Sequence, residues 1–386
     1  MPDVLIHGDT VRSPELRHQL PLAIPDPFLY VERDGSRHAV LTAFEIARLE
    51  ELAIDVEPHP LEEFGLDELV GTGLRSHEVF LEVFARACRA LGIERAAVPP
   101  SFPLALADRL RADGIEVEAD EELFVARRRV KTPRELEGIR RAQAAAEVGM
   151  AAAAAMLARA RGANGVLRLD GEPLTSERIR REIERVFGEH DATADQVIVA
   201  PGPQGAVGHE EGSGAIAPGE PVVIDLFPYD KASGCYADMT RTFVVGDVSD
   251  ELDTYFRLCR EALELALGAI RPGVEGRELH RLVCELFHEH GYPTQLSKEP
   301  GTVLRDGFFH GLGHGVGLEV HEEPGLGRTG VALVAGDVVA VEPGLYRHDY
   351  GGVRLEDLVR VTDDGAEKLT DFPYDLEPGR AGGVAG

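Results

Sequence analysis

Three histidines stand close together near the carboxyl end of the chain, in the run His-Gly-Leu-Gly-His-Gly-Val-Gly-Leu-Glu-Val-His-Glu from His310 to Glu322. Imidazole is the commonest neutral metal ligand and carries protons near neutral pH, and it is costly to bury without a partner. The intervening glycines let other backbone segments approach closely. The run therefore predicts a reactive centre.

Four acidic residues stand in apolar stretches that the pattern predicts to be strands, at 221–226, 234–243, 338–344 and 352–359; the acids are Asp225, Asp238, Glu342 and Glu356. An ionised carboxylate in an apolar strand is heavily penalised unless a cation or hydrogen-bond donors compensate it. The only arginines in these stretches are Arg241 and Arg354. Divalent cations would balance the acids better, and carboxylates with one imidazole suit Mn, Co, Fe or Zn. The predicted chemistry is metal-assisted hydrolysis.

These residues carry a close resemblance to the M24 metallopeptidases, the family of prolidase, aminopeptidase P, methionine aminopeptidase and the metal-free creatinase. The run from His310 to Glu322 resembles the signature of the proline-specific branch. The phrases Asp-Met-Thr-Arg-Thr-Phe, Val-Glu-Pro-Gly-Leu-Tyr and Arg-Leu-Glu-Asp strengthen the match. Ligands of five matching types in matching order are far more specific than a lone short motif. They are Asp225, Asp238, His314, Glu342 and Glu356.

The resemblance implies a dinuclear metal-dependent exopeptidase that hydrolyses the Xaa-Pro bond, as an Xaa-Pro aminopeptidase or an Xaa-Pro dipeptidase (prolidase). Asp225 and Asp238 would hold one ion, Asp238 and Glu356 would bridge to the second, and His314 and Glu342 would complete it. A metal-bridging water would be the nucleophile, and Glu342 would carry the proton. Manganese is the expected metal, with Co, Zn or Fe as alternatives.

Three further histidines have expected roles beside the metal. His310 and His321 would face the substrate and stabilise charge on the carbonyl oxygen or the leaving nitrogen, or would support the metal ligands from behind. His209, in Val-Gly-His-Glu-Glu-Gly-Ser-Gly, resembles the family's upstream substrate-facing histidine. All three are therefore candidate catalytic residues.

Arg354 stands two residues before Glu356, which predicts that both side chains lie on the same face of a strand. It could meet a product carboxylate or anchor the metal site. A plainer interpretation is a structural salt bridge to Asp357 or Glu356.

The spacing between Asp225 and Asp238 is thirteen residues, longer than is usual in the family. The extra length lies in 227–233, so the rim of the pocket should differ from that of relatives. Asp230 falls inside this turn and is a decoy for the first ligand.

Composition narrows the class of protein. The 386 residues include 40 basic and 68 acidic ones, for a net charge of −28, which argues against nucleic acid or an anionic membrane surface as a partner. The four cysteines, Cys88, Cys235, Cys259 and Cys284, form no Cys-x-x-Cys pair. We expect a reduced, cytoplasmic protein without a signal peptide or a membrane span. A small peptide with proline at its second position is the expected substrate, and the family's habit predicts a homodimer.

The predicted fold class is α+β, with a C-terminal pita-bread catalytic domain at 131–386 preceded by a smaller mixed α/β domain at 1–130. Thr132, Pro133 and Glu135 predict the start of a long helix that ends near Arg159. Further helices are expected at 76–91, 104–111, 175–189, 249–270 and 276–290, and short strands at 39–42 and 115–117. The tail after Pro373 is expected to be loosely ordered.

Two rival functions are compatible with the same fold. A creatinase-like amidinohydrolase would work without metal ligands, and a non-catalytic binding protein would have lost ligands or substrate-facing histidines. All of these residues are present in the chain.

Overall fold

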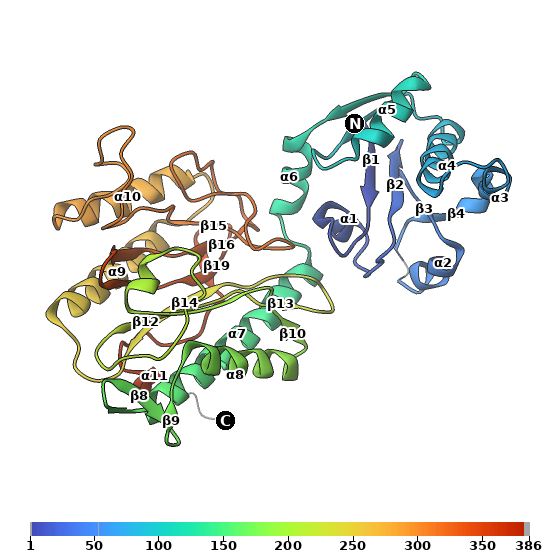
Figure 1. The fold of residues 1–386 in the computed structure, drawn as a ribbon. Coiled ribbons are helices and arrows are strands. Elements are labelled where there is room, and N and C mark those ends of the chain that lie inside the picture. Colours follow the sequence, from blue (N-terminus) through green and yellow to red (C-terminus); the bar gives the residue numbers. More distant parts are fainter. Residues whose placement is uncertain (1, 53, 382–386) are drawn as a thin grey trace. The chain divides into compact units, whose positions relative to one another are not determined.

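A computed structural model describes residues 2–52 and 54–381. The chain forms two compact units, the first ending at Arg128 and the second beginning at Arg129 (Figure 1).

The first unit is built on one mixed sheet of order β4-β3-β2-β1-β5-β6. Along β1, Leu5 belongs to one hydrophobic cluster while Val4 and Ile6 belong to another, so the strand is buried on both faces and helices cover each side. The strands are β1 Asp3–Gly8, β2 Phe28–Arg33, β3 Ser36–Leu41, β4 Glu57–Pro60, β5 Arg95–Val98 and β6 Glu116–Ala119. The helices are α1 Pro14–Gln19, α2 Ala43–Glu50, α3 Leu66–Val70, α4 Ser76–Ala90, α5 Leu104–Ala112 and α6 Glu121–Arg129, with a 3₁₀ turn η1 at Leu61–Phe64.

The second unit opens on the long helix α7, Pro133–Arg159, whose start and end are as predicted. Thr132 accepts a bond from the Glu135 N–H, and the Glu135 side chain accepts one from the Thr132 N–H, which satisfies two donors at the helix start. Small residues on its buried face pack against α8, Ser176–Glu189. This helix pair lies against β12 and β14 (Figure 1).

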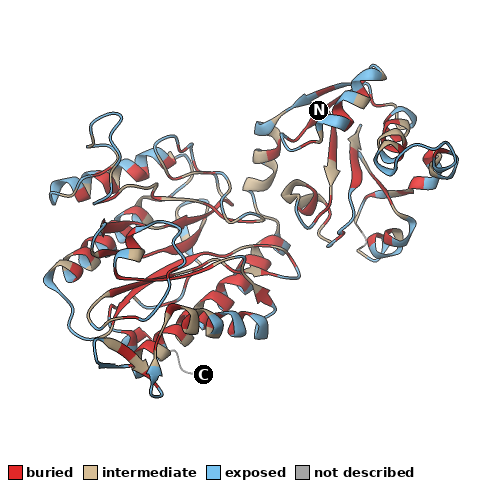
Figure 2. Ribbon diagram, in the orientation of Figure 1, coloured by how far each residue is buried: buried red, intermediate tan, exposed pale blue. Residues whose placement is uncertain are grey.

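Two helix pairs back the strands of the second unit, as predicted. The pair α7/α8 packs on a sheet of β11 Val197–Pro201, β12 Pro221–Leu226 and β14 Met239–Val244. The pair α9 Asp250–Ala269 and α10 Gly276–Glu289 belongs to a second core over β16 to β18. That half contains the sheet β15 Gly313–Gly315, β16 Val338–Val341, β19 Asp357–Val361 and β20 Ala366–Lys368, and the hairpin β17 Gly344–Arg347 with β18 Gly351–Arg354. The central strands are buried, whereas the helices keep one exposed face (Figure 2).

Small peripheral elements complete the second unit. They are β7 Arg161–Ala163, β8 Val166–Leu169, β9 Glu172–Pro173, β10 Ala192–Thr193, β13 Tyr229–Asp230, the 3₁₀ turn η2 Gly202–Ala206 and α11 Pro378–Ala381.

Two local expectations are wrong. Of the four acids assigned to strands, only Asp225 lies inside one; Asp238 precedes β14, Glu342 follows β16, and Glu356 fills the break between β18 and β19. Strand ends free a backbone from ladder pairing, so a side chain there can turn toward a common point. Arg354 and Glu356 therefore do not share one continuous strand. The tail is also ordered through residue 381, because Leu376 is buried and accepts a backbone bond from Val244. Residues 382–386 lie outside the described part.

Candidate metal centre

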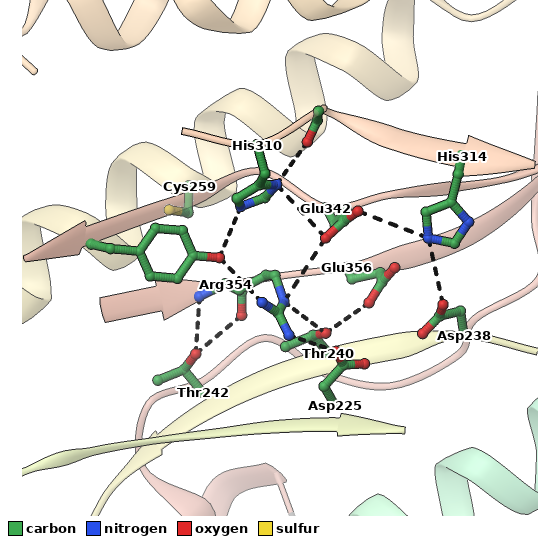
Figure 3. A network of polar contacts seen from close by, with 12 residues as sticks. Asp225, Asp238, Thr240, Thr242, Cys259, His310, His314, Glu342, Arg354 and Glu356 are labelled. Atoms are coloured by element: carbon green, nitrogen blue, oxygen red, sulfur yellow. Dashed lines mark hydrogen bonds and ion pairs between the residues drawn. The ribbon is translucent and has the colours of Figure 1, made fainter. Parts of the chain in front are cut away.

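All five predicted metal ligands line one cavity of about 300 Å³ in the second unit. The same cavity is lined by the other predicted site residues, His209, His310, His321 and Arg354. Figure 3 shows carboxylates from several separate chain segments turned toward one another around Arg354. Asp238, His314 and Glu356 offer ligand atoms within 4.8 Å of one another.

The pairing of β12 with β14 places the acids that come from this sheet, which packs against α7 and α8. Asp225 on β12 pairs with Thr240 on β14, so their side chains share one face of the sheet. Asp238, two residues before Thr240 and just outside β14, lines the same cavity as Asp225. The Glu356 N–H donates to the Thr240 carbonyl at 3.1 Å, and the Thr240 hydroxyl donates to Glu356 Oε2 at 2.7 Å. Thr240 thus joins acids that come from distant parts of the chain.

The glycine-rich run places the imidazole. His314 lies on β15 opposite Ala340 of β16, and a Cβ built on Gly313 would stand 1.9 Å from the Ala340 carbonyl oxygen. Only glycine permits this approach, as the sequence predicts. Glu342, just beyond the end of β16, is thereby brought beside His314.

The His314 ring is oriented for metal binding. Its Nδ1 lies 3.1 Å from the Gly315 carbonyl, which can only accept, so Nδ1 carries the proton. The unprotonated Nε2 then faces Asp238 Oδ2 at 3.7 Å and Glu342 Oε1 at 3.8 Å. Burial lowers the pKa of His314 to about 4, so the ring is neutral at pH 7. A neutral ring held by a backbone carbonyl is the arrangement found in metal-ligating histidines.

Burial and mutual repulsion act on the carboxylates together. Desolvation, followed by the charges of neighbouring acids, raises the pKa of Asp238 and of Glu356 well above their usual range. Desolvation also raises the pKa of Glu342 to about 7. The raised pKa values of these three acids indicate that the protein itself supplies too little positive charge to balance them.

Arg354 supplies part of that charge. Its guanidinium donates to Asp225 Oδ2 at 2.5 Å, to the Thr240 hydroxyl at 3.2 Å and to the Tyr346 hydroxyl at 3.3 Å (Figure 3). The side chains of Arg354 and Asp225 are 6% and 13% exposed, so this ion pair is shielded from water. Its ion-pair partners are Asp225 and, at 4.0 Å, Glu342, whereas the plainer interpretation named Asp357 or Glu356.

Arg241, the other arginine of the acid-bearing stretches, does not face the cavity. It is fully buried, pairs with Asp357 at 2.9 Å and donates to the Glu356 carbonyl at 2.7 Å. Its guanidinium also lies 4.6 Å from the centre of the Tyr374 ring. Arg241 therefore fixes the backbone that carries Glu356 and leaves the charge of the cavity unchanged.

The residues present fit a pair of divalent cations. Four carboxylates and one guanidinium line the cavity, a formal charge of −3 if all the acids ionise. Asp225 Oδ1 and Asp238 Oδ1 are buried and make no hydrogen bond with any described residue. Buried carboxylate oxygens are seldom left unpaired, and they are the kind of ligand that hard divalent ions bind.

His310 is tied to the protein through both ring nitrogens. Nδ1 donates to the Gly311 carbonyl at 2.7 Å, so Nε2 must accept from the Tyr346 hydroxyl at 3.0 Å. Tyr346 in turn accepts from Arg354. His310 also approaches Glu342, at 3.9 Å. It borders the cavity, but its nitrogens position Tyr346 and the loop.

His321 and His209 have exposed rings at the cavity. The His321 ring centre lies 4.3 Å from that of His314 and 6.4 Å from that of His209. His209 is carried on the loop after η2. Burial and the charge of His209 lower the pKa of His321. These two rings are free to meet a ligand in the cavity.

Two acids near the site have structural partners. Asp230, the decoy in the long turn, accepts from Arg141 of α7 at 2.9 and 3.0 Å and does not line the cavity. Glu322, the last residue of the glycine-rich run, forms a buried ion pair with Lys131. The long turn contributes Phe227 to the cavity wall.

Several functional neighbours were missed by sequence reasoning. Thr240 and Tyr346 lie inside quoted motifs, and period-two alternation with Asp238 would have placed Thr240 at the site. No comparable signal marks the remaining wall residues, which come from loops: Gln196, Gly208, Phe309 and Val320.

Comparison with known proteins now places the chain. The model of metallopeptidase family M24 matches residues 137–363, more than half of the chain. The chain therefore belongs to the M24 metallopeptidase family.

Named relatives fall within the same family. The chain is 37% identical over 186 residues to the Xaa-Pro dipeptidase of Pyrococcus furiosus, covering 47% of this chain and 49% of the relative. The chain thus spans about half the length of the curated relatives that it matches. The prolidase structure from Pyrococcus horikoshii superposes with a TM-score of 0.75 and 24% identity, covering 97% of this chain and 95% of that one. For the X-Pro aminopeptidase of Thermotoga maritima the TM-score is 0.76 at 23% identity, with 96% of each chain covered. The predicted α+β pita-bread fold is confirmed.

Two general features complete the description. Within the described residues, no helix combines the length and apolar character that crossing a membrane requires. The four cysteines are buried and free, and Cys235 is a packing residue outside the cavity wall.

Proposed function

We propose that this protein is a dinuclear metal-dependent exopeptidase that hydrolyses the bond between a residue and a following proline. One observation carries the proposal: five ligand-type side chains and two exposed histidines border a single cavity. The names of the relatives, Xaa-Pro dipeptidase and prolidase, support the substrate class. The cavity lies at the lower end of the volumes of about 300–1,000 Å³ that suit small ligands, which favours a short peptide.

Asp225, Asp238, His314, Glu342 and Glu356 would hold two divalent ions, with Asp238 and Glu356 shared between them. When bound, such ions polarise a carbonyl group and make water nucleophilic near neutral pH. Manganese is the proposed metal, and Co, Zn or Fe could occupy the same ligands. The orphaned oxygens of Asp225 and Asp238 support this assignment.

The chain's own residues divide the remaining work. Glu342 would hold and release the proton at its carboxylate, between His310 and His314. His321 and His209 would donate to charge that develops on the substrate. His310 would act through Tyr346, and Arg354 would hold Asp225 in place. Because the Arg354 guanidinium already donates to Asp225, Thr240 and Tyr346, we infer that it anchors the metal site and does not bind a product carboxylate.

The proposal extends to the domains, the oligomeric state and the location of the protein. We assign residues 131–386 as the catalytic domain and 1–130 as a separate mixed α/β domain that precedes it. A homodimer rests on the family's habit. A cytoplasmic location is supported by the four free, buried cysteines.

A peptide panel tests the function. Purified full-length protein, loaded with Mn, Co or Zn, would be offered Xaa-Pro dipeptides, Xaa-Pro-Yaa peptides and matched peptides with alanine in place of proline. We expect cleavage before proline, and the ratio of dipeptide to tripeptide rates distinguishes dipeptidase from aminopeptidase. Cleavage of the alanine peptides alone would contradict the specificity.

The same assay separates the rivals. A creatinase-like amidinohydrolase would hydrolyse creatine after exhaustive chelation. A non-catalytic binding protein would cleave no member of the panel with any of the three metals. We expect activity that chelation abolishes and that added metal restores.

A further inference from the structure

A second group of histidine and carboxylate side chains lies in the first unit, on the edge of its sheet. β4 is the outermost strand and pairs in parallel with β3, with His38 opposite Glu57. His59 follows Glu57 by two residues, so all three side chains share one face of the sheet. Strand register alone therefore gathers two imidazoles and a carboxylate.

The polar atoms of these side chains converge on one point. His38 Nδ1 lies 3.1 Å from His59 Nε2 and 3.4 Å from Glu57 Oε2, and the three ligand atoms lie within 4.8 Å of one another. Zinc binds nitrogen and oxygen at about 2.0–2.2 Å in tetrahedral geometry, which sets neighbouring ligand atoms about 3.3 Å apart. The two separations measured from His38 Nδ1 match that spacing.

Glu63 fixes the tautomer of His59. His59 Nδ1 lies 3.0 Å from Glu63 Oε2, so it carries the proton, and the lone pair of Nε2 points at His38. A carboxylate behind a histidine is the usual support of a zinc ligand. A single proton on His38 Nδ1 cannot bond well to both His59 Nε2 and Glu57, whereas one cation would satisfy all three groups.

We propose that His38 Nδ1, His59 Nε2 and the Glu57 carboxylate form a zinc site that ties β4 to β3. His59 is buried, whereas the Glu57 side chain is 66% exposed, so water can complete the tetrahedron. Two imidazoles and one carboxylate favour Zn²⁺ over Mn²⁺, in contrast to the carboxylate-rich cavity of the second unit. The site is independent of the proposed peptidase function.

Metal counting tests the site without any activity measurement. Full-length wild-type protein, His59→Ala, Glu57→Gln and Glu63→Gln would be stripped with chelator, dialysed against Zn²⁺ or Mn²⁺, and analysed by elemental mass spectrometry. His59→Ala should hold one Zn²⁺ per chain fewer than wild type, with an unchanged Mn²⁺ count. Glu63→Gln should weaken this zinc affinity by about 10–100-fold.

Matched variants keep the test decisive. His77→Ala removes an exposed histidine from α4 of the same unit and should leave the zinc count unchanged. Because Glu57 is exposed, the Glu57→Gln variant should fold normally. Its affinity for zinc should nevertheless be at least tenfold lower than that of wild type. Circular dichroism would verify folding of His59→Ala. Equal zinc content and affinity in wild type, His59→Ala and Glu57→Gln would overturn the proposal.

Discussion

The two units each contain a cluster of histidine and carboxylate side chains, but the clusters differ in burial and charge. In the second unit, Asp238 and Glu356 are buried and their pKa values are raised by desolvation and by one another. In the first unit, His38 and His59 stand beside the largely exposed Glu57. Buried, crowded carboxylates therefore demand cations, whereas an exposed carboxylate beside imidazoles permits a cation without requiring one.

The largest effect should come from Asp238→Asn, which preserves shape and removes a bridging charge. We expect peptidase activity to fall by at least about a thousandfold, because several kcal/mol of transition-state stabilisation depends on the ions. Bound metal should be lost with it. Steady-state kinetics and elemental analysis would measure both.

The control for that variant is Asp230→Asn in the same hairpin. Asp230 pairs with Arg141, so its replacement should lower the free energy of unfolding by about 1–3 kcal/mol. The metal content of this variant should be unchanged. Retained metal and activity in Asp238→Asn would refute the bridging role.

Arg354→Gln should reveal how strongly the second unit depends on buried charge. We expect the free energy of unfolding to fall by about 3–5 kcal/mol, because Asp225 is left shielded from water without its partner. The matched variant Arg127→Gln breaks a more exposed pair with Glu32 in the first unit and should cost at most about 1 kcal/mol. If urea unfolding showed equal losses of free energy in the two variants, the proposed difference between the buried and the more exposed ion pair would be contradicted.

His321→Asn should affect turnover without affecting the metal. We expect kcat to fall by about 100-fold, the size associated with one positioned donor or proton carrier, while two ions remain bound. His77→Asn, on the surface of the first unit, should be neutral. Unaltered turnover in His321→Asn would reduce this ring to scaffolding.

The smallest effect concerns pH in metal-free protein. Raised pKa values of Asp238, Glu342 and Glu356 mean that the folded state binds more protons than the unfolded state, so stability declines as pH rises above about 4 toward the folded values. Between about pH 7.5 and 9, where the histidines of the unfolded chain are already largely deprotonated, β12 amides should lose protection from hydrogen exchange by about 1 kcal/mol. Manganese should restore it, and β2 amides should not respond.

Glu356→Gln serves as the control for this pH effect, because it removes one of the crowded acids. The variant should lose less protection than wild type over the same interval. If protection declined equally with pH in wild type and in Glu356→Gln, the pH effect would come from groups other than the crowded acids.

Much of the second unit could be predicted from sequence because its signals are local. The capping box of Thr132 and Glu135 marks the start of α7, and ligand types in family order indicate where Asp225 and Glu356 belong. Strand ends were missed because an acid in an apolar stretch looks the same inside a strand or just beyond it. The partner of Arg354 could not be read, since Asp225 is distant in sequence and only the packing of β18 on β12 brings them together.

The cluster in the first unit could not be predicted from sequence for a related reason. Its sheet mixes parallel and antiparallel pairs, and the cluster of His38, Glu57 and His59 depends on the register of an edge strand. His38 and Glu57 are separated by a helix and a loop, so no spacing rule joins them. Register is a tertiary property, which local pattern predicts weakly.

The most direct test of the central claim is anomalous X-ray diffraction from crystals grown with manganese. We expect two anomalous peaks among Asp225, Asp238, His314, Glu342 and Glu356, with Asp238 and Glu356 contacting both. Side chains that point apart, with no anomalous density between them, would contradict it.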